Sequence, residues 1–249
     1  MEQFEREAAW LLKEKYQGIV CDSYHYDLKR LKNVEPLAYL IGSVPFLNVT
    51  IGLASQPLIP RPETEYWVAE VIRTYQTQDK VPNRILDLCA GSGCIGVALG
   101  KAFSKARVDF VEIDTKHHPT IKDNCAKNEV ENLGRIMGGH LFEHIPAGRR
   151  YDLIVSNPPY IDQNLGRVED SVTEYEPALA LYGGAEGLEL IREIIITSPS
   201  YLTKEGSLWL EHEPEQVETI TKIGMEHNFL VNTHKDQYQV QRFSELLLQ

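Results

Sequence analysis

Short apolar runs alternate with helical segments along most of the chain. From about residue 83, runs typical of buried strands are separated by segments in which apolar residues recur every three or four positions. The expected strands cover 84–89, 106–113, 134–138, 151–156, 207–213, 229–236 and 240–249. The expected helices between them cover 94–103, 116–129, 187–202 and 214–228. Strands that alternate with helices predict a doubly wound α/β fold, in which helices cover both faces of a parallel sheet.

The last two expected strands, 229–236 and 240–249, lie too close together for a helical crossover. A parallel connection needs about a dozen residues or more, whereas an antiparallel pair can be joined by a short turn. We therefore expect a mostly parallel, seven-stranded sheet whose last strand is antiparallel.

The pattern differs nearer the start of the chain. Apolar residues at helical spacing in 4–16 indicate an amphipathic helix, and we expect one or two short helices within 3–40. Alternation interrupted by prolines predicts a β-hairpin at 45–55 that ends in a rigid loop, and 63–76 then resembles a helix with an acidic first turn. These patterns divide the chain into a helical segment (1–40), a hairpin with its linker (41–60) and the sheet domain (61–249).

Composition and charge narrow the classes of function. The 249 residues are 43% hydrophobic and 24% charged, which is ordinary for a globular protein. The formal net charge of −11 argues against a protein that holds nucleic acid by neutralising phosphates, because such proteins need a basic surface. We expect no direct nucleic-acid partner.

Cysteine usage and hydropathy bear on the compartment. The 4 cysteines form no CxxC pair, which favours reduced thiols inside a cell. No apolar run approaches the ~18 residues of a membrane span, and the start, MEQFEREAAWLLKEKY, is too charged for a signal peptide. We expect a soluble, intracellular monomer with no membrane partner, mitochondrial in a eukaryotic source and cytoplasmic otherwise.

A glycine turn follows the first strand of the expected sheet. DLCAGSGCIG (87–96) joins that strand to a helix through Gly91 and Gly93, and Asp87 lies near the strand end. Glycines allow a ligand to approach the backbone closely, but a purely structural turn accounts for them equally well. The carboxylate before the turn would repel a pyrophosphate. A ligand without phosphates therefore fits this turn better.

Acidic residues follow the second strand of the sheet. Glu112 stands at its end and Asp114 two residues later. An acid at this position of a nucleotide-binding fold accepts hydrogen bonds from the two ribose hydroxyls. A solvated helix N-cap is the alternative interpretation of either residue, and of Asp114 above all. Together with the glycine turn, these acids describe an adenosine site.

The strand YDLIVS is followed by NPPY (157–160). Two successive prolines cannot continue a central strand, so the chain must leave the sheet beside the glycine turn. There, the side-chain oxygen of Asn157 and the carbonyl of Pro158 can accept hydrogen bonds, and Tyr160 offers a flat wall with a polar tip. Such a pocket suits a planar group with two N–H donors, which is an amide or an exocyclic amine.

Two fixed acceptors matter because an amide nitrogen is a poor nucleophile. They can hold the nitrogen against an electrophile and stabilise the positive charge that grows on it. A methylated amide nitrogen becomes acidic enough to release its proton to water, so no general base is needed before attack.

At this point the sequence resembles a known family. LDLCAGSGCIGVAL, VEID and YDLIVSNPPYI are similar to class I S-adenosylmethionine-dependent methyltransferases of the NPPY type. PLAYLIGSVPF, LIPRPETE and SVTEYEPALALYGGAEGLELIREII narrow this to a resemblance to the release-factor glutamine methyltransferases, the HemK or PrmC family. The resemblance covers about 36–245.

The resemblance implies an activity and a set of site residues. It implies N5-methylation of the glutamine in the Gly-Gly-Gln motif of class I peptide-chain release factors, with S-adenosylmethionine as cofactor, and hence a role in translation termination. The implied cofactor residues are Asp87, Cys89, Gly91, Gly93, Glu112, Asp114, Arg61, Pro62, Glu63 and Asn157. The implied catalytic residues are Asn157, Pro158, Pro159 and Tyr160, and the substrate-binding ones are Asn157, Pro158, Tyr160, Glu174 and Pro177. Thr64 would cap the helix that follows the LIPRPETE loop.

Three features depart from the family pattern. The N-terminal helical part, roughly 35 residues, is several dozen residues shorter than is usual in the family. His140 stands where the family tends to carry an acid that contacts adenine, and LEHEPEQ replaces the usual acid and glycine pattern after the fifth strand. Glu211, His212 and Glu213 suggest a metal site only superficially, since adjacent strand residues point to opposite faces, and we expect no metal.

Two other functions fit parts of the sequence. An NPPY adenine-N6 methyltransferase acting on DNA or RNA would need the same two acceptors, and a flipped base could stack on Tyr160. The acidic charge and the absence of a basic recognition region argue against it. A non-catalytic partner of release factor is the second alternative, and the intact Asn157 and glycine turn argue against that.

Overall fold

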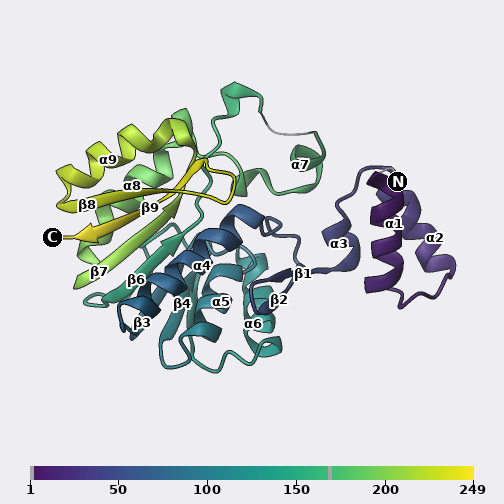
Figure 1. The fold of residues 1–249 in the computed structure, drawn as a ribbon, viewed down its shortest axis with the longest axis horizontal. Coiled ribbons are helices and arrows are strands. Elements are labelled where there is room, and N and C mark those ends of the chain that lie inside the picture. The colour runs from purple at the N-terminus through teal and green to yellow at the C-terminus, as the bar shows by residue number, and fades with distance from the viewer. Residues whose placement is uncertain (1–2, 168–169) are drawn as a thin grey trace.

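The computed structural model describes residues 3–167 and 170–249, in which helices cover both faces of a seven-stranded sheet (Figure 1). The helices are α1 (Gln3–Glu14), α2 (Asp22–Lys32), α3 (Leu37–Ile41), α4 (Pro62–Thr77), α5 (Cys94–Ala102), α6 (His118–Lys127), α7 (Asp170–Tyr175), α8 (Glu189–Thr197) and α9 (Val217–Glu226). The strands are β1 (Ser43–Phe46), β2 (Val49–Gly52), β3 (Arg84–Leu88), β4 (Arg107–Val111), β5 (Leu133–Met137), β6 (Tyr151–Ser156), β7 (Leu202–Glu211), β8 (Phe229–Lys235) and β9 (Gln241–Leu248).

The order of the strands places two sequence motifs side by side. The sheet runs β5-β4-β3-β6-β7-β9-β8, with β9 antiparallel to both of its neighbours. The expected mostly parallel sheet with an antiparallel last strand is thereby confirmed. The chain winds outward from β3 to β5 and then returns to β6, so β3 and β6 flank the point where the winding direction changes. Ligands of doubly wound sheets bind at the carboxyl ends of the strands at such a point.

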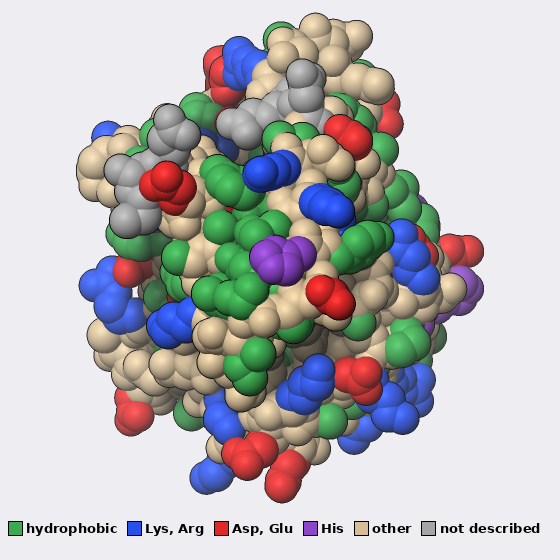
Figure 2. All heavy atoms as spheres, turned by 90° about the vertical axis from the view of Figure 1, so that its right-hand side faces the viewer, with side chains coloured by type: hydrophobic (Ala, Val, Ile, Leu, Met, Phe, Trp, Pro, Cys, Tyr) green, Lys and Arg blue, Asp and Glu red, His purple; other side chains and the backbone are tan. Residues whose placement is uncertain are grey.

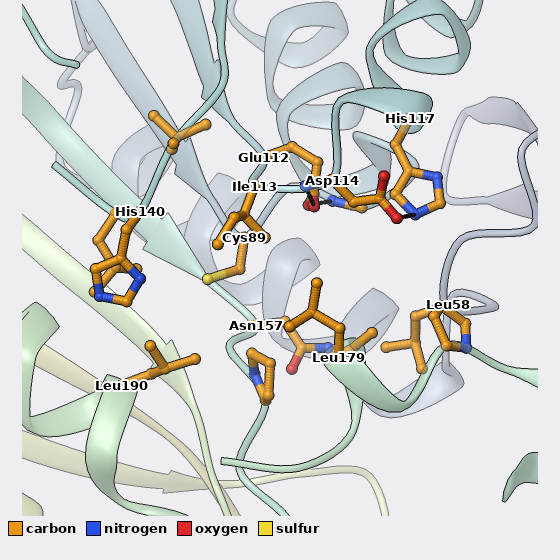
Figure 3. Close-up of a pocket in the computed structure, with 17 residues that line it drawn as sticks. Leu58, Cys89, Glu112, Ile113, Asp114, His117, His140, Asn157, Leu179 and Leu190 are labelled. Atoms are coloured by element: carbon orange, nitrogen blue, oxygen red, sulfur yellow. Dashed lines mark hydrogen bonds and ion pairs between the residues drawn. The ribbon is translucent and has the colours of Figure 1, made fainter. Parts of the chain in front are cut away.

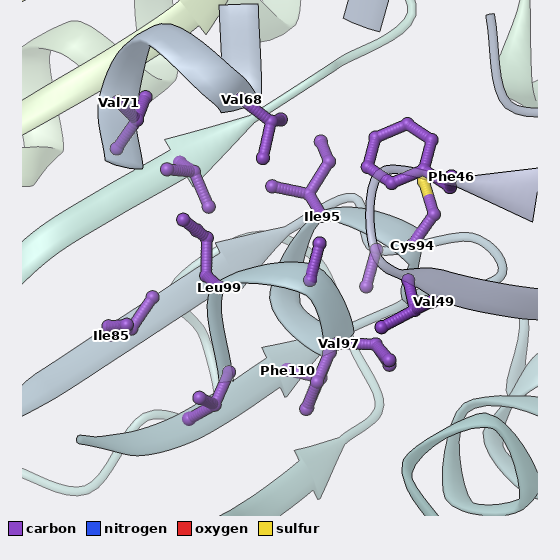
Figure 4. Close-up of a cluster of buried hydrophobic side chains, with 14 of the residues drawn as sticks. Phe46, Val49, Val68, Val71, Ile85, Cys94, Ile95, Val97, Leu99 and Phe110 are labelled. Carbon is purple, nitrogen blue, oxygen red and sulfur yellow. The ribbon is translucent and has the colours of Figure 1, made fainter. Parts of the chain in front are cut away.

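Each face of the sheet has its own apolar core, as expected for strands buried on both sides. Along β3, Ile85 packs in the core beneath α4, α5 and α6, whereas Leu86 packs beneath α8 and α9. Figure 4 shows the first core, where Phe46 and Val49 of the β1-β2 hairpin lie beside α5. The hairpin therefore belongs to the same core as the sheet, and the division of the chain at residues 40 and 60 stays a prediction.

Helices α1, α2 and α3 form a separate small cluster at the end of the molecule that carries the N-terminus (Figure 1). Its buried apolar residues are Leu11, Tyr24, Leu31 and Leu40. Figure 2 faces this end and shows apolar side chains gathered among charged ones. No helix in the described parts of the chain has the length and apolar character to cross a membrane.

Several elements differ from the sequence-based expectation. Three N-terminal helices form instead of one or two, and the hairpin starts at Ser43. The helix expected over 187–202 ends at Thr197, because Pro199 lies in a short 3-10 turn that follows it, and β7 starts at Leu202 where it pairs with β6. Sequence periodicity did not predict α7, since a helix of 6 residues is too short to show a repeat.

Candidate active site

Two adjoining cavities open at the carboxyl edge of the sheet. The first, of about 210 Å³, is lined by residues that follow β3, β4, β5 and β6 and by Pro177 and Leu179 (Figure 3). The second, of about 410 Å³, lies on the other side of the NPPY segment. Asn157 lines both cavities, as do Leu58 and Ala180. The arrangement would place a ligand in each cavity with Asn157 between them.

The glycine turn brings its backbone to the first cavity. Cys89 and Gly91 line this cavity, and Cys89, Gly91 and Gly93 all have positive φ, +57°, +54° and +77°. Gly93 lies at the start of α5, where a Cβ would come within 3.1 Å of Ile121. Burial raises the pKa of the Cys89 thiol to about 12, so this sulfur is a neutral wall of the cavity.

Asp87 lies beneath the turn and is fully buried, and it is not among the residues that line the cavity. Its Oδ2 accepts from the Gly96 amide at 2.8 Å, whereas no described residue donates to Oδ1. Burial, reinforced by the nearby Glu112 carboxylate, holds the pKa of Asp87 well above its usual range. Its observed role is to anchor the start of α5 under the turn.

Glu112 follows β4 and reaches into the first cavity. Its Oε2 accepts from the Gly91 amide at 2.7 Å and its Oε1 from the Asp114 amide at 2.8 Å. Each oxygen keeps a further lone pair for a ligand. Asp114 lines the same cavity and caps the short helical turn Thr115–His117, so its N-cap interpretation is confirmed and its contact with a cofactor stays a prediction.

This cavity fits an uncharged or cationic nucleoside better than a nucleotide. Its carboxylates are Glu112 and Asp114, and no Lys or Arg is found among its described lining residues. The Gly91 amide, which would meet a phosphate, is already bonded to Glu112. The remaining walls are largely apolar, with Ile113 and Leu190 among them. S-adenosylmethionine, a sulfonium without phosphates, matches this combination.

The NPPY segment leaves β6 between the two cavities. Asn157 lines both, Pro158 and Tyr160 line the second, and Pro159 lines the first. The Asn157 amide donates from Nδ2 to the Thr64 hydroxyl at 3.2 Å. No residue that the structure describes donates to Asn157 Oδ1, so this oxygen remains an acceptor for a ligand.

Glu211, at the end of β7, holds side chains of this segment and of α4 by hydrogen bonds. No sequence pattern had indicated this role. Glu211 is 1% exposed and accepts hydrogen bonds from Thr64, Trp67 and Tyr160, at 2.6, 2.7 and 2.9 Å. The expectation that Thr64 caps α4 is wrong. The helix begins at Pro62 with no side-chain cap, and Thr64 is buried within the first turn and faces Glu211.

Arg61 belongs to the second cavity instead of the first. Its guanidinium pairs with Glu176 at 2.6 Å, and Glu176 also accepts from the Ile59 amide at 3.0 Å. This buried carboxylate thereby ties the LIPRPETE loop to the segment after α7. Pro62 and Glu63 form the first turn of α4 and line neither cavity.

The substrate side of the site differs in detail from the expectation. Pro177 lines the first cavity, whereas Glu174 lies exposed on α7 and lines neither of the two. Glu176, between them, is the buried residue of this stretch. Alternation of polar and apolar residues could not single it out, because its partner Arg61 lies 115 residues away in the chain.

Histidines around the site take part in separate interactions. His140 lines the first cavity, and its Nε2 lies 2.8 Å from Glu193 of α8. His212 points away from Glu211, with Nδ1 at 3.0 Å from the Glu213 carbonyl and Nε2 at 2.8 Å from Ser244. Glu211, the last residue of β7, and His212, which directly follows it in the chain, thus have separate partners.

Comparison with known proteins identifies the family. Residues 71–174 match the family model of the methyltransferase small domain. A release factor glutamine methyltransferase from Thermodesulfovibrio yellowstonii is 34% identical over 204 residues, which cover 82% of this chain and 72% of that protein. The chain belongs to the release factor glutamine methyltransferase family. Another member, from Clostridium botulinum, is 33% identical, with coverage of 87% of this chain and 74% of that protein.

Membership of the release factor glutamine methyltransferase family makes this chain an S-adenosylmethionine-dependent methyltransferase, as the resemblance implied. The fold agrees: the crystal structure of a methyltransferase from Pyrococcus furiosus matches with a TM-score of 0.55 at 16% identity, covering 76% of this chain and 86% of that chain. The first cavity, with two carboxylates and no Lys or Arg among its described lining residues, lies at the edge of the sheet where a doubly wound fold binds its ligand.

Proposed function

We propose that this chain methylates the side-chain amide nitrogen of the glutamine in the Gly-Gly-Gln motif of a class I peptide-chain release factor. The observation that carries the proposal is the position of Asn157, whose Oδ1 has no donor among the described residues and lies where the two cavities meet. Relatives that cover most of the chain and carry the name release factor glutamine methyltransferase support the choice of substrate.

In the proposed complex the cofactor occupies the first cavity and the glutamine side chain enters through the second. Glu112 would accept hydrogen bonds from the ribose hydroxyls with the lone pairs that Gly91 and Asp114 leave unused. Bound S-adenosylmethionine supplies an electrophilic methyl group. Arg61 and Glu176 would hold the loop that closes the substrate side.

Asn157 and Pro158 would orient the reacting nitrogen. Asn157 Oδ1 and the Pro158 carbonyl each accept one hydrogen of the substrate NH₂, which leaves the nitrogen facing the methyl group. The same two dipoles stabilise the positive charge that develops as the nitrogen–carbon bond forms and the carbon–sulfur bond breaks. The methylated nitrogen then loses one proton to water. Tyr160 would not act as a base, because its hydroxyl donates to Glu211 and burial holds its pKa well above the usual range.

Radiolabelled cofactor tests the reaction directly. Purified chain should transfer one labelled methyl group to a release factor with an intact Gly-Gly-Gln motif, and none to the same factor with Ala in place of the glutamine. The Asn157→Ala variant should lose transfer while its cofactor affinity changes by less than about threefold, because Asn157 contacts the cofactor only at the edge of its site.

Other outcomes would point to other functions. Two proteins that are 33% and 34% identical to this chain are named ribosomal protein uL3 glutamine methyltransferase, so uL3 belongs in the assay as a second glutamine substrate. Methylation of uL3 alone would replace release factor as the substrate and keep the amide chemistry. Labelling of duplex DNA or RNA with both proteins untouched would favour the adenine reaction, and release-factor binding without transfer would favour a non-catalytic partner.

We further propose that the chain acts as a monomer inside the cell, in the mitochondrion of a eukaryotic source or otherwise in the cytoplasm, without contacting nucleic acid. None of the four cysteines, all of which lie in the described residues, forms a disulfide, which supports a reducing compartment. The net charge of −11 supports a protein substrate over a nucleic acid.

A further inference from the structure

A chain of hydrogen bonds connects β7 to the substrate side of Asn157. Trp67 Nε1 and Thr64 Oγ1 both donate to Glu211 Oε2, at 2.7 and 2.6 Å, and Asn157 Nδ2 donates to Thr64 Oγ1 at 3.2 Å. Glu211 and Thr64 are each 1% exposed, so their own side chains are shielded from water. This series of hydrogen bonds joins residues of α4 and β7 to Asn157, which follows β6, and its other members line neither cavity.

The direction in which hydrogen bonds are donated along this series follows from the chemistry of its members. The indole N–H of Trp67 can only donate, which favours Glu211 Oε2 as an unprotonated acceptor. The Thr64 hydroxyl has one hydrogen and gives it to that oxygen. Toward Asn157 the hydroxyl oxygen can then only accept. If the carbonyl oxygen of Asn157 faced Thr64, two acceptors would oppose each other without a hydrogen between them, which is unfavourable.

Packing cannot make this choice, because the oxygen and the NH₂ of a side-chain amide have almost the same size. If Asn157 were turned by 180° about its terminal bond, its NH₂ would face the NH₂ of the substrate, and two donors cannot pair. Whether Thr64 accepts a hydrogen bond from Asn157 or donates one to it therefore decides if Asn157 can accept a hydrogen bond from a substrate amide.

We propose that Glu211 and Thr64 are positioning residues that set the orientation of the Asn157 amide and so direct its oxygen to the substrate nitrogen. This inference rests on the proposed function, in which Asn157 Oδ1 receives a substrate N–H. Glu211 also holds the other end of the motif, since its Oε1 accepts from the Tyr160 hydroxyl at 2.9 Å. One buried carboxylate thus aligns both polar side chains of NPPY.

Isosteric replacement of Thr64 tests the proposal. In Thr64→Val the acceptor for Asn157 Nδ2 is lost at unchanged volume, and we expect kcat to fall at least about tenfold, the equivalent of one lost hydrogen bond of about 1.4 kcal/mol. KM for the cofactor should stay within about twofold, because Thr64 does not line the cofactor cavity. Thr64→Ser keeps the hydroxyl and should recover most of kcat.

A matched control separates orientation from stability. Thr203 Oγ1 donates to Asp152 Oδ1 at 3.1 Å, which is a hydroxyl–carboxylate bond at the opposite edge of the sheet. Thr203→Val removes a bond of the same kind from a place remote from the site, and its kcat should match that of the unchanged protein. If Thr203→Val and Thr64→Val lost stability and kcat in parallel, Thr64 would be only structural and the proposal would be wrong.

The side-chain amide of Asn157 provides a readout that needs no substrate. Its two N–H resonances in a ¹⁵N NMR spectrum are assigned as the pair that is missing in Asn157→Ala. We expect one of them at the downfield position of a hydrogen-bonded proton in the unchanged protein and in Thr64→Ser, and shifted upfield in Thr64→Val. Unshifted resonances in Thr64→Val would overturn the proposal. Because this measurement is independent of methyl transfer, it tests the positioning role even if the release factor is not the substrate.

Glu211→Gln gives a second, independent variant. Trp67 can only donate, so the glutamine should place its oxygen toward Trp67 and Thr64 and its NH₂ toward the Tyr160 oxygen, which can accept. Thr64 would then still donate to residue 211 and accept from Asn157, so kcat should fall less than in Thr64→Val. Glu211→Met removes the acceptor altogether and should shift the Asn157 resonances as Thr64→Val does. A larger kcat loss in Glu211→Gln than in Thr64→Val would contradict the proposed direction of the chain.

Discussion

At the residue scale, the site depends on which polar atoms are left without a partner. Glu112 has both oxygens engaged by backbone amides and still presents them to the cofactor cavity, whereas Asn157 has its nitrogen engaged and its oxygen free of described donors. Both groups are held in place by protein contacts before a ligand arrives. Such preorganisation lowers the cost of ordering the site on binding.

Removal of the Glu112 charge should weaken cofactor binding. In Glu112→Gln one oxygen becomes an NH₂, which opposes either the backbone amides or a ribose hydroxyl donor, and we expect the cofactor Kd to rise about tenfold or more, for a loss of ~1–3 kcal/mol. Calorimetric titration with S-adenosylmethionine measures this. Asp114→Asn is the matched control and should change Kd less, because Asp114 has its carboxylate paired with Lys116 at 3.0 Å. Equal affinities for Glu112→Gln and the unchanged protein would contradict the ribose assignment.

At the element scale, strand β7 separates two environments. Its last residue, Glu211, bonds to Thr64 of α4, while His212, which directly follows the strand, bonds to Ser244 of β9. His212 is fully buried, and the Glu213 carbonyl receives its Nδ1–H, so the neutral ring accepts from Ser244 at Nε2. Burial lowers the pKa of His212 to about 4.

This buried imidazole predicts a pH dependence of stability. Between pH 6.5 and about 4 the unfolded chain binds a proton at His212 that the folded chain does not, so acidification in this window favours unfolding. The loss approaches ~1.4 kcal/mol per pH unit. Urea unfolding at pH 7, 6 and 5 should show a steeper decline for the unchanged protein than for His212→Gln. Parallel declines would show that His212 titrates normally in the fold.

At the scale of the whole molecule, the N-terminal helices stand apart from the methyltransferase core. Their own centre is Asp27, whose carboxylate accepts from Lys15, Tyr16 and Arg30 at 2.6, 2.7 and 2.9 Å. Desolvation opposes the charged form of Asp27, but these donors outweigh it and lower its pKa. The cluster α1–α3 therefore depends on one buried ionic network in addition to its four apolar core residues.

Loss of that network should unfold one end of the molecule and leave the other intact. Asp27 is 3% exposed and accepts hydrogen bonds from Lys15, Tyr16 and Arg30. Asp27→Asn removes this charged acceptor at a cost of about 1–3 kcal/mol, and it should speed amide hydrogen exchange within 3–41. Exchange in β3 and β6 and the cofactor Kd should not change, because every residue that lines the two cavities follows residue 57 in the chain. Asp22→Asn, at an exposed position of α2, is the control. Faster exchange across the sheet would show that the two parts fold together.

The sequence predicted the succession of strands and helices along the chain and the edge of the sheet at which the polar site residues lie. Those features are local: periodicity reports one element at a time, and two prolines end a strand wherever the strand lies. The missed elements, such as α7, are too short to carry a repeat. The misassigned Thr64 followed a capping rule that holds for a helix start in isolation, but here Pro62 begins the helix and Thr64 turns to a buried partner.

The sequence alone therefore predicted the fold class, the glycine turn and the acceptors of NPPY, because each depends on residues that are contiguous in the chain. Only the tertiary structure decided which partner the Asn157 amide nitrogen meets. Thr64 and Glu211 are 147 residues apart, and they meet because α4 packs on the face of the sheet that β6 and β7 share. Arg61 and Glu176 are 115 residues apart and meet where the segment after α7 lies against the LIPRPETE loop. The direction of a hydrogen bond depends on the partner at its other end, and no local pattern in the chain contains that partner.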